Sequence, residues 1–339
     1  MQPVTVSHPP ANAPAAQDSR GGRLQSTIRR AIQQSGIVLV FLLLLLLLAA
    51  LVPDFTSRGN VTGLLLSVTL TGTIASSMML VLALGEVDLS IASIVAFAGV
   101  VGSVAANTLG APLGILCGIL AGGAIGLFNG VVVAWFGINS LIATLATMEA
   151  VRGLAYIASG GDAVPIMAPA FFGLSSASFL GLTTPVWIMF LSFVVLGFVL
   201  NRTVFGRDVL AIGGNVEAAR LAGIPVTRLR IGVFALQGLL AGLAGVLLTS
   251  RMGLGDPKTS IGLELAVISA CVLGGVSLSG GIATISGVVV GVLIMGCVQD
   301  AMGLLNVPAF YQYLVRGGIL LLAVMFDRWK TGRKAATLR

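Results

Sequence analysis

Charged residues are scarce in this sequence: Asp, Glu, Lys and Arg make up only 9% of 339 residues, against roughly 25% in a typical soluble domain. Because this number of charges is too small to cover a water-exposed surface, most of the chain must face lipid or other helices. The 45 glycines agree with this, because small residues let membrane helices approach closely. The apolar runs are long and continuous, which argues against the alternating strands of an outer-membrane barrel.

Residues that usually build catalytic or metal sites are also scarce. The single histidine, His8, lies in the polar N-terminal segment, which excludes a histidine-based metal or catalytic site. The three cysteines lie inside apolar runs, where they behave as small hydrophobic residues: Cys117, Cys271 and Cys297. No Gly-x-x-x-x-Gly-Lys-Ser/Thr motif occurs, so the chain does not bind ATP through that loop. We expect neither an enzyme nor a bound cofactor, and the scattered basic residues do not indicate nucleic-acid binding.

The apolar runs predict an all-α integral membrane protein with about ten transmembrane helices. A membrane-spanning helix needs about 20 predominantly apolar residues, and ten such runs occur: 37–52, 61–84, 89–107, 112–136, 139–158, 184–200, 230–250, 263–278, 283–299 and 311–326. The polar residues 1–35 predict a disordered cytoplasmic tail, which is too long for the start of a cleaved signal peptide. The transmembrane domain is expected at 36–327, followed by a basic cytoplasmic tail at 328–339.

The basic residues predict the orientation, because cytoplasmic loops are enriched in Lys and Arg. With both termini inside and ten crossings, fourteen of the nineteen basic residues fall inside: Arg20, Arg23, Arg29, Arg30, Arg202, Arg207, Arg220, Arg228, Arg230, Arg328, Lys330, Arg333, Lys334 and Arg339. The long segment 160–184 contains no Lys or Arg, as an external loop should. An odd number of crossings would place one basic tail outside, so we expect cytoplasmic N- and C-termini.

Two segments resemble each other and indicate an internal repeat. Residues 84–90 and 273–279 both read L-G-x-V-[D/S]-L-S, and each precedes a Gly/Val-rich helix. Internal repeats are common in transporters, although chance similarity among glycines and aliphatic residues is the alternative. The helix count places both motifs on the cytoplasmic side, whereas an inverted repeat would place them on opposite sides. The type of symmetry therefore stays open.

The loop at 201–230 is the only internal loop long enough to carry its own structure. A short helix is predicted near 213–223, because Asn215 is a favourable N-cap. Glu217 in the first turn and Arg220 near the end complement the helix dipole.

The end of this predicted helix is equally well marked. Gly223 fits the left-handed position after a helix, and Pro225 prevents the helix from continuing. Two turns of helix are unstable alone in water, so the segment needs a surface to dock on. The alternative from these residues alone is an ordinary basic loop with a frayed turn.

This loop resembles the coupling helix of permeases in the ribose/xylose/arabinose class of ABC sugar importers. The resemblance is carried by Gly213, Gly214, Asn215, Glu217, Ala218, Ala219, Arg220, Leu221 and Gly223. Residues 85–90, G-E-V-D-L-S, are similar to the G-x-x-D-L-S signature of the same family. The segments 138–148, 151–156 and 268–278 are most similar to L-arabinose permeases. The resemblance extends from about residue 36 to 328.

The resemblance implies a permease of the bacterial inner membrane that forms the translocation path for L-arabinose or a related pentose or hexose. It also implies three partners: an ATPase subunit that binds ATP and Mg²⁺, a periplasmic sugar-binding protein that selects the sugar, and a second permease copy in a homodimer. In that family the coupling helix seats in a cleft of the ATPase and transmits its closure to the membrane helices.

Few polar groups lie within the apolar runs, where a charge costs about 2.5–3.5 kcal/mol on insertion scales. Glu149 and Arg152 are three residues apart and could pair on one helix face, and we interpret them as structural. A neutral sugar needs hydrogen-bonding groups along its path, and the candidates are Glu86, Asp88, Asn139, Thr144, Thr147, Gln299 and Asp300. The alternative is that such residues hold helices together or reach toward the membrane surface.

An ion-coupled secondary sugar transporter is the main rival interpretation. It would explain the helices and the repeat without any partner. Proton relays generally use chains of Asp, Glu or His, and these are scarce here. A scaffold membrane protein would give no reason for the capped cytoplasmic helix.

Overall fold

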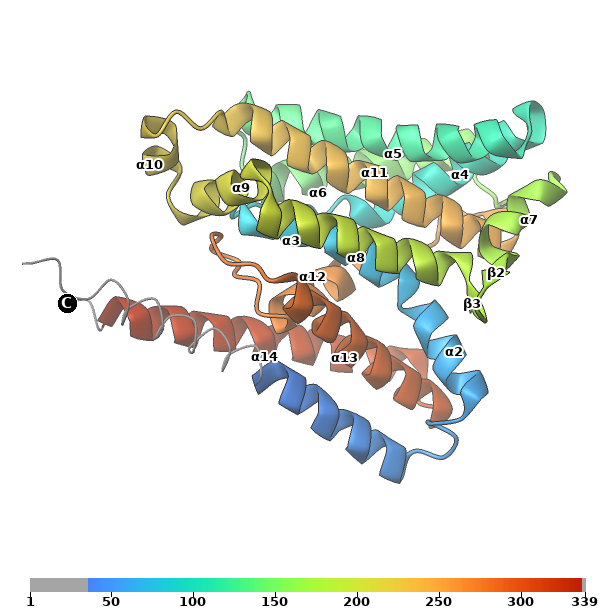
Figure 1. The fold of residues 1–339 in the computed structure, drawn as a ribbon. Coiled ribbons are helices and arrows are strands. Elements are labelled where there is room, and N and C mark those ends of the chain that lie inside the picture. Colours follow the sequence, from blue (N-terminus) through green and yellow to red (C-terminus); the bar gives the residue numbers. More distant parts are fainter. Residues whose placement is uncertain (1–35, 337–339) are drawn as a thin grey trace, which may run out of the picture.

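The structure, a computed structural model, describes the backbone of residues 36–336 and side chains as far as residue 325. It is a bundle of helices with four two-residue strands (Figure 1). The first helix is Gly36–Leu51. The following elements are α2 (Arg58–Ser67), α3 (Thr69–Ala83), α4 (Ile91–Leu109), α5 (Ala111–Ala134), α6 (Ser140–Ser159), β1 (Val164–Pro165), α7 (Pro169–Ser176), β2 (Ser178–Phe179), β3 (Leu182–Thr183), α8 (Thr184–Arg202), α9 (Val204–Gly214), α10 (Val216–Leu221), α11 (Val226–Met252), β4 (Leu254–Gly255), α12 (Leu263–Leu273), α13 (Ile285–Leu304) and α14 (Ala309–Ala336).

Six of the described helices are long and apolar enough to cross a membrane: α4, α5, α6, α8, α11 and α13. The pair α2 and α3 would make a seventh span, with a bend of 41° between its halves. Three shorter apolar helices also occur, at Gly36–Leu51, Leu263–Leu273 and Ala309–Met325. The predicted helical membrane protein is confirmed, and the count of ten crossings stays a prediction.

Glycines bring α5 and α11 into backbone contact. A methyl group added at Gly126 on α5 would lie 2.7 Å from the Cα atom of Gly238 on α11, and one at Gly122 would lie 2.6 Å from the Cα atom of Gly242. Helices that pack without side chains between them need glycine at these positions. The layer formed by α4, α5 and α11 is the upper part of Figure 1, and α12, α13 and α14 lie on its other side beyond α3 and α8.

The two ends of the bundle carry different structures. At one end α10 protrudes beside α9, and at the other lie α7 and the β2–β3 hairpin (Figure 1). Strand β1 pairs antiparallel with β4 near α7, and the Asn107 side chain at the end of α4 bonds the backbone on both sides of Ile166, at Pro165 and Met167.

Four details differ from the sequence expectations. The predicted helix 61–84 is broken at Val68, whose side chain packs against Gly296 of α13. The predicted helix 263–278 stops at Leu273, because Gly275 adopts a left-handed conformation with φ +85°. Residues 204–214, expected as loop, form α9. The basic segment from 328 continues α14 as far as Ala336. The predicted tail 1–35 lies outside the described residues.

Candidate functional site

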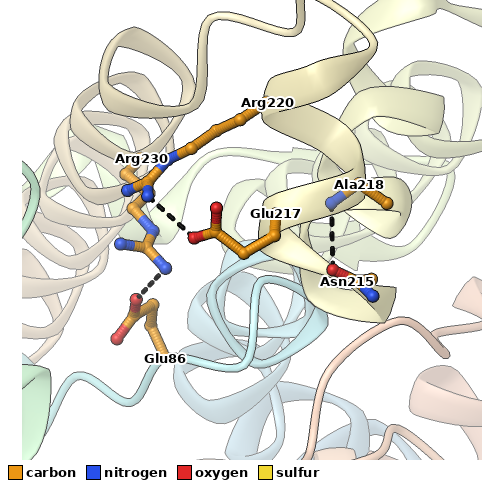
Figure 2. A network of polar contacts seen from close by, with 6 residues as sticks. All are labelled: Glu86, Asn215, Glu217, Ala218, Arg220 and Arg230. Atoms are coloured by element: carbon orange, nitrogen blue, oxygen red, sulfur yellow. Dashed lines mark hydrogen bonds and ion pairs between the residues drawn. The ribbon is translucent and has the colours of Figure 1, made fainter.

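The short helix predicted near 213–223 is present as α10. The Asn215 side-chain oxygen accepts a hydrogen bond from the Ala218 backbone N–H at 3.0 Å, as an N-cap does (Figure 2). The helix is shorter than the predicted range 213–223, because Gly213 and Gly214 are the last residues of α9. The sequence did not predict α9, because the Val204–Gly214 segment contains three glycines and begins next to a charged helix end.

The far end of α10 also has the predicted geometry. Gly223 is left-handed, with φ +80°, and its N–H donates to the Arg220 carbonyl at 2.9 Å. The helix rests on one buried residue, Ala219. Val216 packs partly against the core. The opposite face is exposed: Leu221 is 90% exposed, and the Glu217–Arg220 ion pair of 2.9 Å lies on the surface.

A second ion pair lies beneath α10. The Arg230 guanidinium on α11 contacts the Glu86 carboxylate in the loop after α3 at 3.0 Å (Figure 2). Both side chains are largely buried, with 19% and 13% exposed. Because Arg230 lies in the second turn of the helix that follows α10, the pair joins this region to the loop 84–90.

The two repeat motifs end their helices in the same way and meet at the end of the bundle that carries α10. The N–H of Gly85 donates to Leu82 and that of Glu86 to Val81, and the N–H groups of Gly275 and Val276 donate to Val272 and Cys271 in the same pattern. The equivalent glycines are therefore Gly85 and Gly275, one residue away from the alignment that the sequence suggested.

The two motif loops also contact each other and the end of α9. The Gly281 N–H donates to the Ala83 carbonyl at 2.9 Å, and a methyl group at Gly280 would lie 2.7 Å from the Gly213 carbonyl. Both loops therefore lie at the same end of the bundle as α10, which is the end that the helix count assigned to them.

A buried polar cluster is built on the first motif loop. The fully buried Asp88 accepts hydrogen bonds from the Ser90 N–H at 2.9 Å and the Ser90 hydroxyl at 2.6 Å. The Ser90 hydroxyl in turn accepts from the Asn129 amide on α5 at 2.8 Å. Burial raises the pKa of Asp88, which lies in the loop between α3 and α4, to about 6. The second Asp88 oxygen and the Asn129 oxygen have no hydrogen-bond partner among the described residues.

The start of α6 holds the same loop in place. The Ser140 hydroxyl accepts from the Val87 N–H at 3.1 Å, and the Thr144 hydroxyl accepts from the Leu89 N–H at 3.1 Å. The roles of Ser140 and Asn129 were missed, because hydroxyl and amide residues inside apolar runs give no signal of their partners.

The seven path candidates do not gather in one place. Glu86, Asp88 and Thr144 lie around the loop 84–90, while Asn139 caps α6 from an exposed position and Thr147 bonds within its own helix. The other two candidates are Gln299 and Asp300. They are half-buried near the C-terminal end of α13, away from the loop that precedes this helix. The Asp300 carboxylate accepts from the Asn60 amide on α2 at 2.7 Å.

The predicted Glu149–Arg152 pair is not formed. The Arg152 guanidinium instead donates to the backbone carbonyls of Pro257 and Thr259, at 2.6 and 2.9 Å, because the loop after β4 offers two acceptors within its reach. Glu149 is exposed and takes part in neither of the two ion pairs found in the described part of the chain. Within residues 36–336, no three His, Cys, Asp or Glu residues are grouped as metal ligands would be.

Known proteins match nearly the whole chain. Residues 60–324 match the family model described as the permease component of branched-chain amino acid transport systems. The L-arabinose ABC transporter permease of Azospirillum brasilense is 62% identical over 99% of this chain and 98% of its own. The L-arabinose transport system permease of Escherichia coli is 50% identical over 90% and 93% of the two chains.

A ribose import permease is more distant. That of Bacillus subtilis is 38% identical over 88% of this chain and 94% of its own. No solved structure matches. The family match, these relatives and the bundle of apolar helices lead to one conclusion. The chain belongs to the permease family of ABC sugar importers, as a multi-pass transport subunit of the inner membrane.

Proposed function

We propose that this permease imports L-arabinose, or a related pentose or hexose, together with an ATPase subunit, a periplasmic sugar-binding protein and a second copy of itself. The names of the two L-arabinose relatives, at 62% and 50% identity, support this sugar over ribose, whose permeases are 38% identical or less. ATP and Mg²⁺ bind the ATPase, and this chain supplies the passage through the membrane.

The observation that carries the coupling proposal is the exposure of α10. A helix of six residues is unstable by itself, yet both of its ends are capped, and its last residue, Leu221, is 90% exposed. An exposed large apolar side chain on a rigid protrusion is suited to a partner protein's cleft. The ATPase therefore docks on α10, and movement passes through the Glu86–Arg230 pair to the helices.

The ten-crossing topology is part of the same proposal. The six long spans, the bent α2–α3 pair and the three shorter apolar helices together supply ten apolar segments. With ten crossings, both termini lie on the side of α10, which is the cytoplasm.

The test is purification of the chain from its native membrane with identification of its partners. We expect a P-loop ATPase to co-purify. Leu221→Glu should reduce the recovered ATPase at least tenfold, and Glu217→Ala/Arg220→Ala should abolish ATP-driven uptake with normal membrane insertion. Leu180→Glu is the matched control, because Leu180 is 77% exposed at the opposite end of the bundle. Undiminished ATPase recovery with Leu221→Glu would refute docking through α10.

A further inference from the structure

Glu149 is an exposed carboxylate in the middle of a membrane span. Helix α6 covers Ser140–Ser159, so at a rise of 1.5 Å per residue Glu149 lies about 14 Å from one end and about 15 Å from the other. Long side chains near helix ends can extend to the membrane surface, but a glutamate at mid-span is too short to do so. If this face contacted lipid, the carboxylate would sit at the centre of the hydrocarbon core.

Glu149 has no close partner in the described part of the chain, although the charge of Arg152 attracts it from farther away. Its neighbour Arg152 is held by the carbonyls of Pro257 and Thr259, and Glu149 accepts no hydrogen bond from a protein group and forms no ion pair among the described residues. A charge at the bilayer centre costs about 2.5–3.5 kcal/mol even on the mildest scales, and such residues almost always face a bundle interior or a water-filled cavity. The surface around Glu149 is therefore not a lipid surface.

The rest of α6 supports this conclusion independently. Of the six long spans, α6 has both the lowest mean hydropathy and the smallest buried share. A helix exposed to lipid should show the opposite relation, with the most exposed span the most apolar. Three of the exposed residues beside Glu149 are small, namely Ala146, Ala150 and Gly153, and the fourth, Leu145, is 39% exposed. A methyl group added at Gly153 would meet no atom within 4 Å. The small residues leave room for water or a ligand at the carboxylate.

We propose that Glu149 on α6 faces the water-filled sugar path, and that its carboxylate accepts hydrogen bonds from sugar hydroxyls there. This rests on the proposed function. A carboxylate acceptor suits a neutral sugar, since each hydroxyl is a hydrogen-bond donor.

Cysteine labelling of the assembled importer in proteoliposomes tests the location. In a background with Cys117, Cys271 and Cys297 replaced by alanine, Glu149→Cys should react with a charged, membrane-impermeant thiol reagent at least tenfold faster than Val194→Cys. Val194 is the matched control, because it is 50% exposed at the middle of α8 in an apolar surface. A labelling rate equal to that of Val194→Cys would overturn the proposal.

Transport measurements test the role of the carboxylate. Glu149→Leu should lower the L-arabinose carried per ATP hydrolysed at least tenfold, while Glu149→Gln, which keeps an acceptor oxygen, should retain a substantial part of it. Wild-type transport efficiency in Glu149→Leu would overturn the role in sugar binding. Failure of the wild-type complex to move L-arabinose with ATP would instead refute the proposed function, and the labelling result would then stand by itself.

Discussion

The Glu86–Arg230 ion pair should stabilise the end of the bundle that carries α10 measurably. Two unit charges at the observed 3.0 Å attract by about 1.4 kcal/mol in water and about 5.5 kcal/mol at an effective dielectric constant of 20. Because both side chains are largely buried, loss of their hydration offsets much of this attraction. We therefore expect a coupling energy of about 1–3 kcal/mol between the two residues.

A double-mutant cycle measures this energy. Glu86→Ala, Arg230→Ala and the double variant are unfolded by denaturant in detergent, and the loss in the double variant should be smaller than the sum of the single losses. The exposed Glu217–Arg220 pair is the internal control, and its cycle should give only about 0.3–0.5 kcal/mol.

The same pair should matter for transport. Each single variant should lower ATP-driven uptake several-fold, and the exchanged pair Glu86→Arg/Arg230→Glu should recover much of it, since attraction rather than residue identity joins the loop to α11. A coupling energy below about 0.5 kcal/mol, or an exchanged pair as inactive as the single variants, would refute the argument.

Three further substitutions have defined outcomes. Burial raises the pKa of the Asp88 carboxyl from 3.8 to about 6, and Asp88→Asn removes this buried charge. The substitution should therefore stabilise the protein by at most about 3 kcal/mol above pH 6, and the gain should shrink as pH falls below 6. A pH-independent loss of thermal stability would contradict this. Gly213→Ala should lower the thermal midpoint because its methyl group would overlap the backbone at the end of α3, whereas Gly214→Ala, with open space, should not. Asn215→Ala removes the cap of α10 at a cost of about 1 kcal/mol, so trypsin should cleave after Arg220 several-fold faster, and unchanged cleavage would contradict the capping role.

The sequence predicted the elements that depend on local chemistry. Asn215 and Gly223 mark the two ends of α10 because capping involves only neighbouring backbone groups. The apolar runs predicted the spans because their length is set by the membrane. The helix count predicted that both repeat motifs lie on the same side as the loop 201–230, and the contacts between the motif loops agree.

The parts that depend on tertiary packing could not be predicted. The spacing of Glu149 and Arg152 allows a pair, but the competing carbonyl acceptors come from residues more than one hundred positions away. The break at Val68 has no glycine or proline signal, since it arises where α13 packs against the helix. The hydrogen bond from Asn129 on α5 to Ser90 could not be predicted either, because nothing in an apolar run reveals which helix faces Asn129.

The central claim is that this chain is the passage of an ATP-driven importer. The direct measurement is L-arabinose uptake into proteoliposomes that contain the permease with its ATPase and sugar-binding protein, with and without ATP and with and without a proton gradient. We predict uptake that requires ATP and all three components and does not respond to the gradient. Uptake by the permease alone, driven by a proton gradient without ATP, would contradict the account and identify an ion-coupled secondary transporter.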